Sequence, residues 1–114
     1  MDIDFVFEEP WEPVEKPQLL LQQLKSEISP GHVLEGKTNR VLACRVDGDD
    51  ILVETRDGYA MVHLTWCKRS RPSLPFPHTV LFASWGEFLE QSYLPERAQW
   101  CEENPASDWE QMIE

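Results

Sequence analysis

Basic residues are scarce in this sequence. Its 114 residues include 10 lysines and arginines against 21 aspartates and glutamates, which gives a formal net charge of −11. A protein that binds nucleic acid needs basic side chains to displace the counterions of the phosphates. Anionic membrane surfaces attract basic segments for the same electrostatic reason. The composition therefore predicts that neither nucleic acid nor a membrane is a partner.

Cysteine and long apolar runs are also scarce. The three cysteines, Cys44, Cys67 and Cys101, form no Cys-x-x-Cys pair, whereas a small secreted disulfide scaffold usually has an even and denser set. No apolar run approaches the roughly 18 residues of a membrane span. The acidic residues 1–4 stand where a signal peptide has a basic start. We therefore expect a cytoplasmic protein with reduced thiols.

The common motifs of catalysis and metal binding are missing too. The sequence has no Gly-x-Ser-x-Gly, P-loop, His-Glu-x-x-His or Gly-x-Gly-x-x-Gly motif. His63 and Cys67 lie four residues apart, and zinc accepts both types of ligand. However, they straddle the end of a predicted strand, and His78 and Cys101 do not complete the spacing of a zinc site. The sequence predicts no metal and no cofactor, and it favours a binding protein over an enzyme.

Apolar residues are present in sufficient number for one folded domain. They make up 41% of the chain, and 11% of the residues are aromatic, so burial can offset the entropy of ordering the chain. The length is typical of one domain. We expect residues 1–114 to form a single domain, with an acidic N-terminal segment at 1–16 and an acidic tail at 105–114.

Hydrophobic periodicity predicts an α+β fold. The predicted strands, most of which alternate apolar and polar residues, span 2–7, 40–47, 51–56, 59–66 and 80–83. Two predicted helices, 19–28 and 85–94, carry an apolar stripe. A third predicted helix spans 96–103. Pro17 suits the first turn of a helix, and Ser84-x-x-Glu87 matches a capping box. Pro10 and Pro13 are expected to interrupt any regular element between 8 and 13.

Turn residues set a predicted register for the central strands. Asp57-Gly58 is a strong two-residue hairpin signal, because both residues tolerate positive φ, and Gly48-Asp49 is the second predicted loop. In this register Val53 lies opposite Val62. One face then carries nearly all the apolar side chains, namely Leu42, Cys44, Val46, Ile51, Val53, Ala60, Val62, Leu64 and Trp66. We expect a three- to four-stranded antiparallel meander that packs this one face against two or three helices.

The acidic surplus lies at the two ends of the chain. Residues 1–16 carry six acids and one base, and residues 86–114 carry eight acids and one base, whereas residues 17–85 have a net charge of +1. If both ends lie on one side of the domain, they form a strongly negative face. The alternative is that the end charges only keep a small protein soluble.

Each acidic end also carries a tryptophan, which makes these ends a candidate binding site. Aromatic anchors are enriched in binding hot spots, and surrounding acids steer a basic partner. The predicted partner-binding residues are Glu8, Glu9, Trp11, Glu12, Asp108, Trp109 and Glu110. The alternative is that each tryptophan pins its end of the chain onto the domain by burying apolar area.

The second face of the predicted sheet is an alternative site. The register places Arg45, Leu52 and His63 in one row, with Glu54 diagonal to both charged residues, so they form a candidate acid–base cluster in which His63 titrates near neutral pH. The alternative is an exposed ion pair worth a few tenths of a kcal/mol. On the same face, Leu52 and Met61 offer a surface for self-association.

The residues Tyr59–Trp66 (Tyr-Ala-Met-Val-His-Leu-Thr-Trp) and Ser84-Trp85-Gly86-Glu87-Phe88, separated by a proline-rich loop, resemble segments of a group of small stand-alone bacterial proteins. The resemblance covers about residues 50–95 and implies no established activity. In size, charge and architecture the chain is also similar to immunity proteins, which bind and neutralise a toxin. That similarity assigns no role to any residue.

The leading hypothesis is a cytoplasmic, acidic protein that binds a basic protein partner, with a toxin-neutralising immunity protein that acts by occlusion as its specific form. A small enzyme or ligand-binding domain and a self-associating structural module, present as a homo-oligomer, stay open as alternatives.

Overall fold

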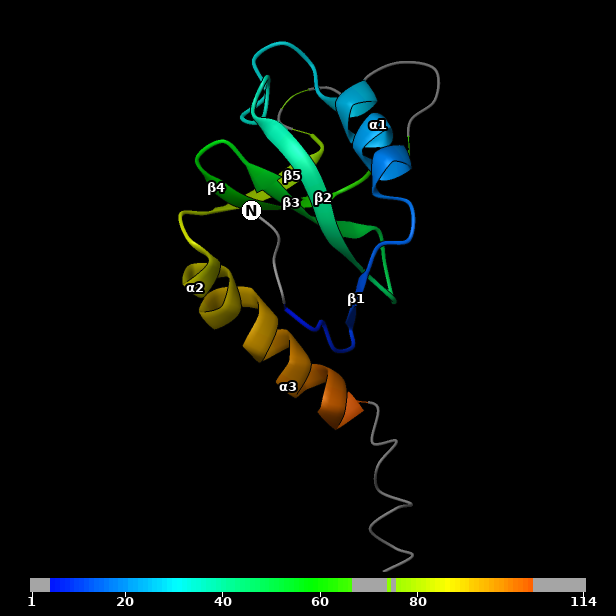
Figure 1. The fold of residues 1–114 in the computed structure, drawn as a ribbon, viewed down its shortest axis with the longest axis vertical. Coiled ribbons are helices and arrows are strands. Elements are labelled where there is room, and N and C mark those ends of the chain that lie inside the picture. The colour runs from blue at the N-terminus through cyan, green and yellow to red at the C-terminus, as the bar shows by residue number, and fades with distance from the viewer. Residues whose placement is uncertain (1–4, 67–73, 75, 104–114) are drawn as a thin grey trace, which may run out of the picture.

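The computed structural model of the chain describes residues 5–66, 74 and 76–103. These residues form an α+β fold in which a five-stranded antiparallel sheet has the order β1-β2-β3-β4-β5 (Figure 1). The predicted class is confirmed, with one strand more than expected. In chain order the elements are β1 (Trp11–Pro13), α1 (Pro17–Glu27), β2 (Thr38–Arg45), β3 (Asp50–Thr55), β4 (Gly58–His63), β5 (His78–Phe82), α2 (Trp85–Phe88), the π-helical segment η1 (Leu89–Tyr93) and α3 (Leu94–Glu103).

The N-terminal strand differs from the prediction. Residues 5–7 have no regular structure, and residues 2–4 lie outside the described part. Strand β1 instead begins directly after Pro10 and ends at Pro13, and Trp11 pairs with Arg45 and Pro13 with Ala43. A proline at the last position of an edge strand removes no hydrogen bond from the sheet. The prolines therefore delimit this strand and do not prevent it.

The β3–β4 hairpin turns one residue earlier than predicted. Thr55 pairs with Gly58, so Arg56 and Asp57 form the loop. A Cβ on Gly58 would lie 2.3 Å from the carbonyl oxygen of Phe82, so the close approach of β5 requires this glycine. Val53 pairs with Ala60, two positions from its predicted partner Val62. A shift of two residues leaves every side chain on its predicted face.

Irregularities in β2 redirect its side chains. The register with β3 shifts between Thr38 and Arg40 and again between Val41 and Ala43. A bulge of this kind inserts an extra residue and re-aims the side chains beside it. Val41 therefore enters the core on the α1 side, and Leu42, predicted for that core, packs on the opposite face.

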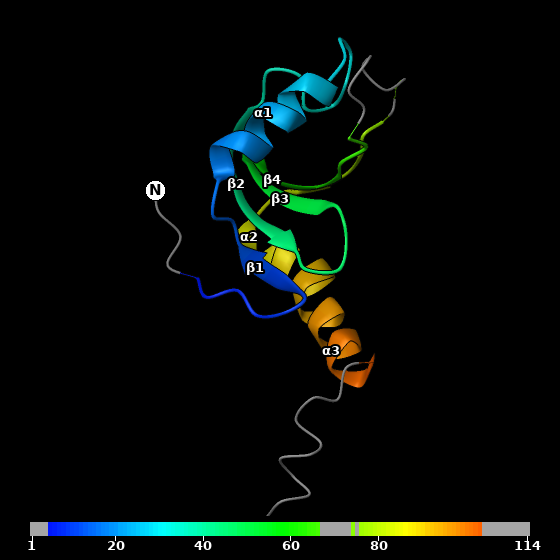
Figure 2. The ribbon, with the colours of Figure 1, turned by 90° about the vertical axis from the view of Figure 1, so that its right-hand side faces the viewer.

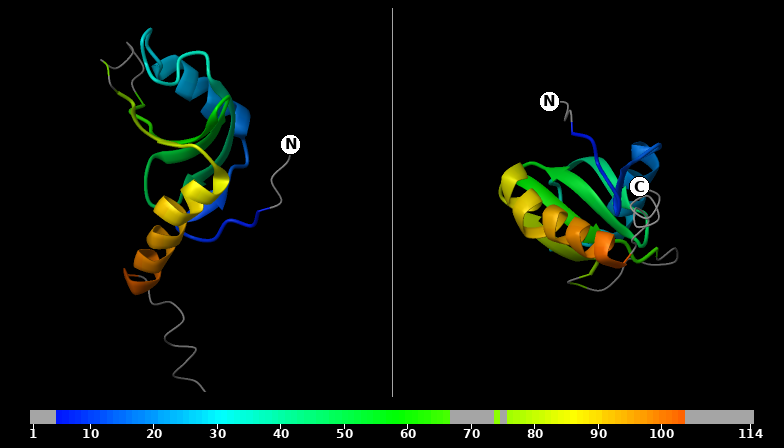
Figure 3. Two further views of the ribbon diagram at one scale, coloured as in Figure 1. Left: turned by 90° about the vertical axis from the view of Figure 1, so that its left-hand side faces the viewer. Right: turned by 90° about the horizontal axis from the view of Figure 1, so that it is seen from below.

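Helices cover both faces of the sheet, and the prediction that they share one face is wrong. Figures 2 and 3 show α1 on one side of the sheet and the α2–η1–α3 helix on the other. The core on the α1 side is aliphatic and consists of Leu24, Leu34, Val41, Ile51, Val53, Ala60, Val62 and Leu64. The core on the other side is largely aromatic and consists of Trp11, Ala43, Leu52, Phe82, Phe88 and Tyr93. Val46 and Trp66, predicted for the core, are exposed.

The predicted capping of the C-terminal helix is confirmed. The backbone N–H of Glu87 donates to Ser84 Oγ at 3.1 Å, and the Glu87 carboxylate accepts from the N–H of Ala83 at 3.3 Å. Helix α2 continues through η1 into α3, and the N–H of Leu94 donates to the carbonyl of Leu89, five residues back. Pro95 has no N–H to donate, so the π-helical pattern ends there. No helix in the described ranges is both long enough and apolar enough to cross a lipid bilayer.

Candidate protein-binding site

The acidic N-terminal segment lies beside the acidic C-terminal helix. Arg97 on α3 donates to the carbonyl oxygen of Glu9 at 2.6 Å and to the carboxylate of Glu8 at 3.0 Å. The N–H of Glu8 also donates to the hydroxyl of Tyr93 at 2.9 Å. Figure 1 shows the segment before β1 passing close to α3. Two acidic segments that are far apart in the sequence therefore meet on one side of the fold.

The turn between β2 and β3 brings a third acidic segment to the same place. It carries Asp47, Asp49 and Asp50, and the N–H of Val46 donates to the carbonyl of Pro10 at 2.8 Å. We define the acidic end as residues 8–12, 45–50 and 94–103, which Figures 1 and 2 show at one end of the molecule. These residues include nine carboxylates against two arginines, so they carry a formal net charge of −7.

Arg45 holds the acidic end together. Its Nε and Nη2 donate to the two carboxylate oxygens of Asp47 at 2.8 and 2.9 Å, and Nη1 donates to Glu96 on α3. Glu96 also accepts from the hydroxyl of Ser92. The guanidinium carbon lies 5.9 Å from the ring centroid of Trp11. Arg45 therefore joins β2, the turn and α3, and its donors are already engaged within the protein.

The ion pair of Arg45 and Asp47 changes the titration of both groups. The pKa of Asp47 lies below its usual value, chiefly because its carboxylate accepts the hydrogen bonds of Arg45. The pKa of Arg45 is raised, chiefly by the same hydrogen bonds. A bidentate pair of this geometry is stronger than a neutral hydrogen bond. Both groups are therefore charged throughout the physiological pH range.

Exposed apolar side chains lie within and beside the acidic end. Val46 is in the turn, Leu94 begins α3 with 58% of its surface exposed, and Trp66 follows β4 with 44% exposed. The indole N–H of Trp66 donates to Asp49 at 3.0 Å, which ties this ring to the turn. Tryptophan is enriched in binding hot spots, so this exposed and oriented ring is a candidate interface anchor.

The backbone of Trp66 adopts a left-handed conformation, with φ of 59°. This conformation costs a residue other than glycine about 1–3 kcal/mol, and it persists only where the surroundings impose it. Among the described residues that are not glycine, Trp66 is the only one with positive φ.

The group that imposes this conformation is Glu27, at the end of α1. Its side chain is fully buried. Its carboxylate accepts from the N–H of Thr65 at 2.7 Å, the hydroxyl of Thr65 at 2.8 Å, the N–H of Trp66 at 3.0 Å and the side chain of Gln23 at 2.7 Å. Glu27 was not among the residues predicted from the sequence. The one signal in the sequence was an acid three residues after Leu24, on the apolar stripe of the helix.

The predicted partner-binding residues divide into three groups. Glu8, Glu9 and Glu12 are exposed on the acidic end. Trp11 is buried, with 1% of its surface exposed, and packs edge-on against Phe88 at a centroid distance of 5.7 Å. Its side chain therefore pins the N-terminal segment to the aromatic core. Asp108, Trp109 and Glu110 lie outside the described residues.

The alternative cluster of Arg45, Glu54 and His63 does not come together. Glu54 lies opposite Arg40, with 3.3 Å between its carboxylate and Arg40 Nε, and His63 Nδ1 lies 2.9 Å from the carboxylate of Asp50. The predicted row is wrong because the two-residue register difference and the bulges place Leu52 opposite Ala43 and Met61. Leu52 is fully buried under the helices, so this face is not open for self-association.

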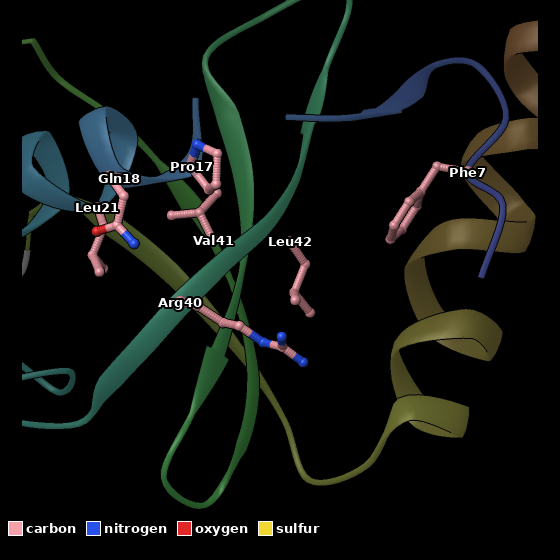
Figure 4. A pocket seen from close by; sticks show the side chains of 7 residues that line it. All are labelled: Phe7, Pro17, Gln18, Leu21, Arg40, Val41 and Leu42. Carbon is pink, nitrogen blue, oxygen red and sulfur yellow. The ribbon is translucent and has the colours of Figure 1, made fainter. Parts of the chain in front are cut away.

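A groove of about 420 Å³ lies along β2 beyond the end of β1 (Figure 4). It is lined by Phe7, Pro17, Gln18, Leu21, Arg40, Val41 and Leu42. None of these residues is an acid, a histidine or a nucleophile, so the groove offers no acid–base pair. Across the described part of the chain, no three His, Cys, Asp or Glu side chains converge to hold a metal ion.

Comparison of the chain with protein-family models, with curated proteins and with solved structures finds no match. The similarity of residues 50–95 to small bacterial proteins therefore stays a prediction, and the site has to be interpreted from its own geometry.

Proposed function

We propose that this chain is an acidic protein-binding module that covers a basic surface on a partner protein. More specifically, we propose an immunity protein that neutralises a toxin by covering the toxin's functional surface. The observation that carries the proposal is that three acidic segments meet, with the exposed side chains of Val46 and Leu94 within them. The exposed ring of Trp66 is tied to the turn of the acidic end by its hydrogen bond to Asp49.

The carboxylates and the exposed tryptophan have different roles in this proposal. The surplus of seven negative charges attracts a basic partner over a distance of about one Debye length, ~8 Å at physiological ionic strength, and raises the association rate. The indole of Trp66 then loses its exposed surface in the contact and supplies binding energy. Glu27 and Asp49 hold that ring in one orientation before binding, which reduces the entropy lost in the complex.

The test isolates a partner and then asks which residues bind it. Tagged protein is used to capture partners from lysate of the source cells at low salt, and the captured protein is purified for titration. Trp66→Ala is expected to weaken binding by at least about 30-fold, which corresponds to a hot-spot loss of about 2 kcal/mol. Leu19→Ala is the matched control, because Leu19 is 57% exposed on α1, away from the acidic end.

A second variant tests the electrostatic part. Glu9→Gln combined with Glu12→Gln removes two exposed carboxylates and is expected to slow association and to flatten its dependence on salt. Thermal unfolding of each variant shows whether the fold is retained. A partner that binds the wild type and the Trp66→Ala variant equally well, at every salt concentration, would refute the proposal. If the partner is a toxin, co-expression of the wild type restores growth and co-expression of Trp66→Ala does not.

A further inference from the structure

We propose that the chain forms a symmetric dimer in which β5 pairs antiparallel with β5 of a second copy, so that the two sheets join into one of ten strands. This proposal is independent of the proposed binding function. It concerns β5, and Leu81, which makes the contact, lies outside the acidic end.

The two edges of the sheet differ in their protection against pairing. Strand β1 has three residues, of which Glu12 is charged and Pro13 lacks an N–H, and its neighbour β2 is interrupted by two register shifts. Short length, charge, proline and bulges are the devices by which proteins block an edge. Strand β5 has five residues, no lysine, arginine, acid or proline, and an unbroken register with β4. No described strand pairs with its outer side.

The side chains beside β5 are apolar and exposed. Leu81 lies opposite Ala60, so it projects on the α1 side of the sheet, and 52% of its surface is exposed. Val33 and Phe76 are exposed as well. A groove of about 350 Å³ runs from Val33 past Leu81. Its charged groups are Lys37 and Asp57, which lie 3.7 Å apart and offset each other, and Glu87, whose carboxylate accepts from the N–H of Ala83.

A second copy fits this edge better than a foreign segment does. In a pair centred on Val80, Thr79 lies opposite Leu81 of the second copy, so the exposed leucines of both chains are covered on one face. Histidine is the only titratable residue type in the strand, so β5 has little charge with which to select a foreign segment. A copy has the same length and the same alternation of side chains.

The net charge does not prevent this pairing. Strand β1 lies four strands from β5, about 19 Å at the usual strand spacing. The β1 strands of the two copies are then about 43 Å apart, several times the Debye length of ~8 Å. The antiparallel arrangement also sends the two acidic turns at 45–50 to opposite ends of the β5 pair. Repulsion between the acidic ends is therefore screened.

The test is sedimentation velocity of the full chain over a range of concentrations in physiological salt. The wild type is expected to show a monomer–dimer equilibrium, and Leu81→Lys is expected to raise its dissociation constant at least about tenfold, because an ammonium group enters an apolar contact. Leu19→Lys is the matched control, because it makes the same change in charge at a leucine on α1 that is similarly exposed and lies outside the acidic end, and it is expected to leave the constant unchanged.

Hydrogen exchange locates the contact. The amides of residues 78–82 are expected to exchange more slowly at concentrations where the dimer forms. A wild type that stays monomeric at all concentrations would overturn the proposal, even if another protein protects these amides. A dimer that survives Leu81→Lys, or that Leu19→Lys weakens equally, would overturn the assignment of the contact to β5.

Discussion

The two faces of the sheet are packed by different kinds of side chain. On the α1 side, aliphatic residues of the strands meet Leu24 and Leu34 from segments that follow β1 and precede β2. On the other side, aromatic rings from both ends of the described chain interlock, as where Phe88 lies 5.4 Å from Phe82 and 5.7 Å from Trp11. The first core is built from residues between Leu24 and Leu64, whereas the second joins residues near both ends of the described chain, from Trp11 to Tyr93.

This difference determines where the acidic end forms. Aromatic side chains bury a large area and carry polar groups at their edges, so Tyr93 packs in the core while its hydroxyl accepts from the N–H of Glu8. Arg45 lies over the ring of Trp11 while its guanidinium reaches Asp47 and Glu96. The aromatic packing therefore brings the carboxylates of three segments together at its rim.

The largest expected effect comes from removing one anchor on each face. Phe88→Ala is expected to lower the free energy of unfolding by about 3–5 kcal/mol, because it removes a buried ring and leaves a cavity. Leu24→Ala, on the aliphatic side, is expected to cost about 2–5 kcal/mol by the same mechanism. Denaturant titration measures both values.

Leu19→Ala is the control, because Leu19 is exposed on the same helix as Leu24. It is expected to change the free energy of unfolding by no more than about 0.5 kcal/mol. In addition, Phe88→Ala is expected to speed hydrogen exchange in residues 8–12, and Leu24→Ala is not. Equal exchange in the two variants would show that the aromatic face does not hold the N-terminal segment in place.

A smaller loss of stability is expected from changing Glu27, a buried charged residue on the aliphatic side. Glu27→Gln is expected to lower the free energy of unfolding by about 2–3 kcal/mol. The amide has one accepting oxygen for the four donors that the carboxylate receives, and its NH₂ group faces a donor. Faster amide exchange at Thr65 and Trp66 is the local measurement.

Glu15→Gln is the control for this substitution, because Glu15 is exposed and precedes the helix that carries Glu27. If Glu27→Gln leaves both the stability and the exchange at Trp66 unchanged, the buried carboxylate does not hold the left-handed backbone.

The smallest effect on stability is expected from removing the carboxylate of Asp47, which lies at the rim of the aromatic side. Its folded pKa lies below the unfolded value because of Arg45, so the pair stabilises the fold above the unfolded pKa, and this contribution is lost as the pH falls through the folded pKa. The Asp47 side chain is 39% exposed, so the contribution is expected to stay below about 1 kcal/mol.

Unfolding of Asp47→Asn and of the wild type, measured between neutral pH and strongly acidic pH, checks this expectation. The variant is expected to be slightly less stable at neutral pH, and the difference is expected to disappear in acid. Asp57→Asn is the control, because that carboxylate is more exposed and lies 3.7 Å from Lys37. A difference that grows in acid would contradict the assigned sign.

The sequence predicted those elements whose signals are local. Alternation located β2, β3, β4 and β5 to within a few residues at most boundaries, and the spacing of Ser84 and Glu87 marked the start of α2. The predicted register between β3 and β4 was wrong because Gly58 was interpreted as a turn residue. Its actual constraint, the carbonyl of Phe82, comes from a strand 20 residues or more along the chain, which no local pattern reveals.

The acidic charge of the candidate site was predicted from the sequence, but the exposed tryptophan beside it was not. The acidic ends and their possible convergence followed from counting charges. Trp66 was expected in the core because strand β4 was predicted to continue to residue 66, whereas β4 ends at His63. The strand ends there because Glu27, 38 residues earlier, takes the N–H groups of Thr65 and Trp66, and a partner at that separation has no signature in the sequence.

By itself, the sequence determined the class of the fold, the scarcity of basic charge and the position of most elements, because these follow from composition and from periodicities of two and 3.6 residues. Tertiary structure alone decided which face each helix covers, which strands remain edges and which tryptophan is exposed. These outcomes depend on the packing of residues that are distant in the chain, where a single bulge in β2 or one buried carboxylate re-aims the side chains that follow.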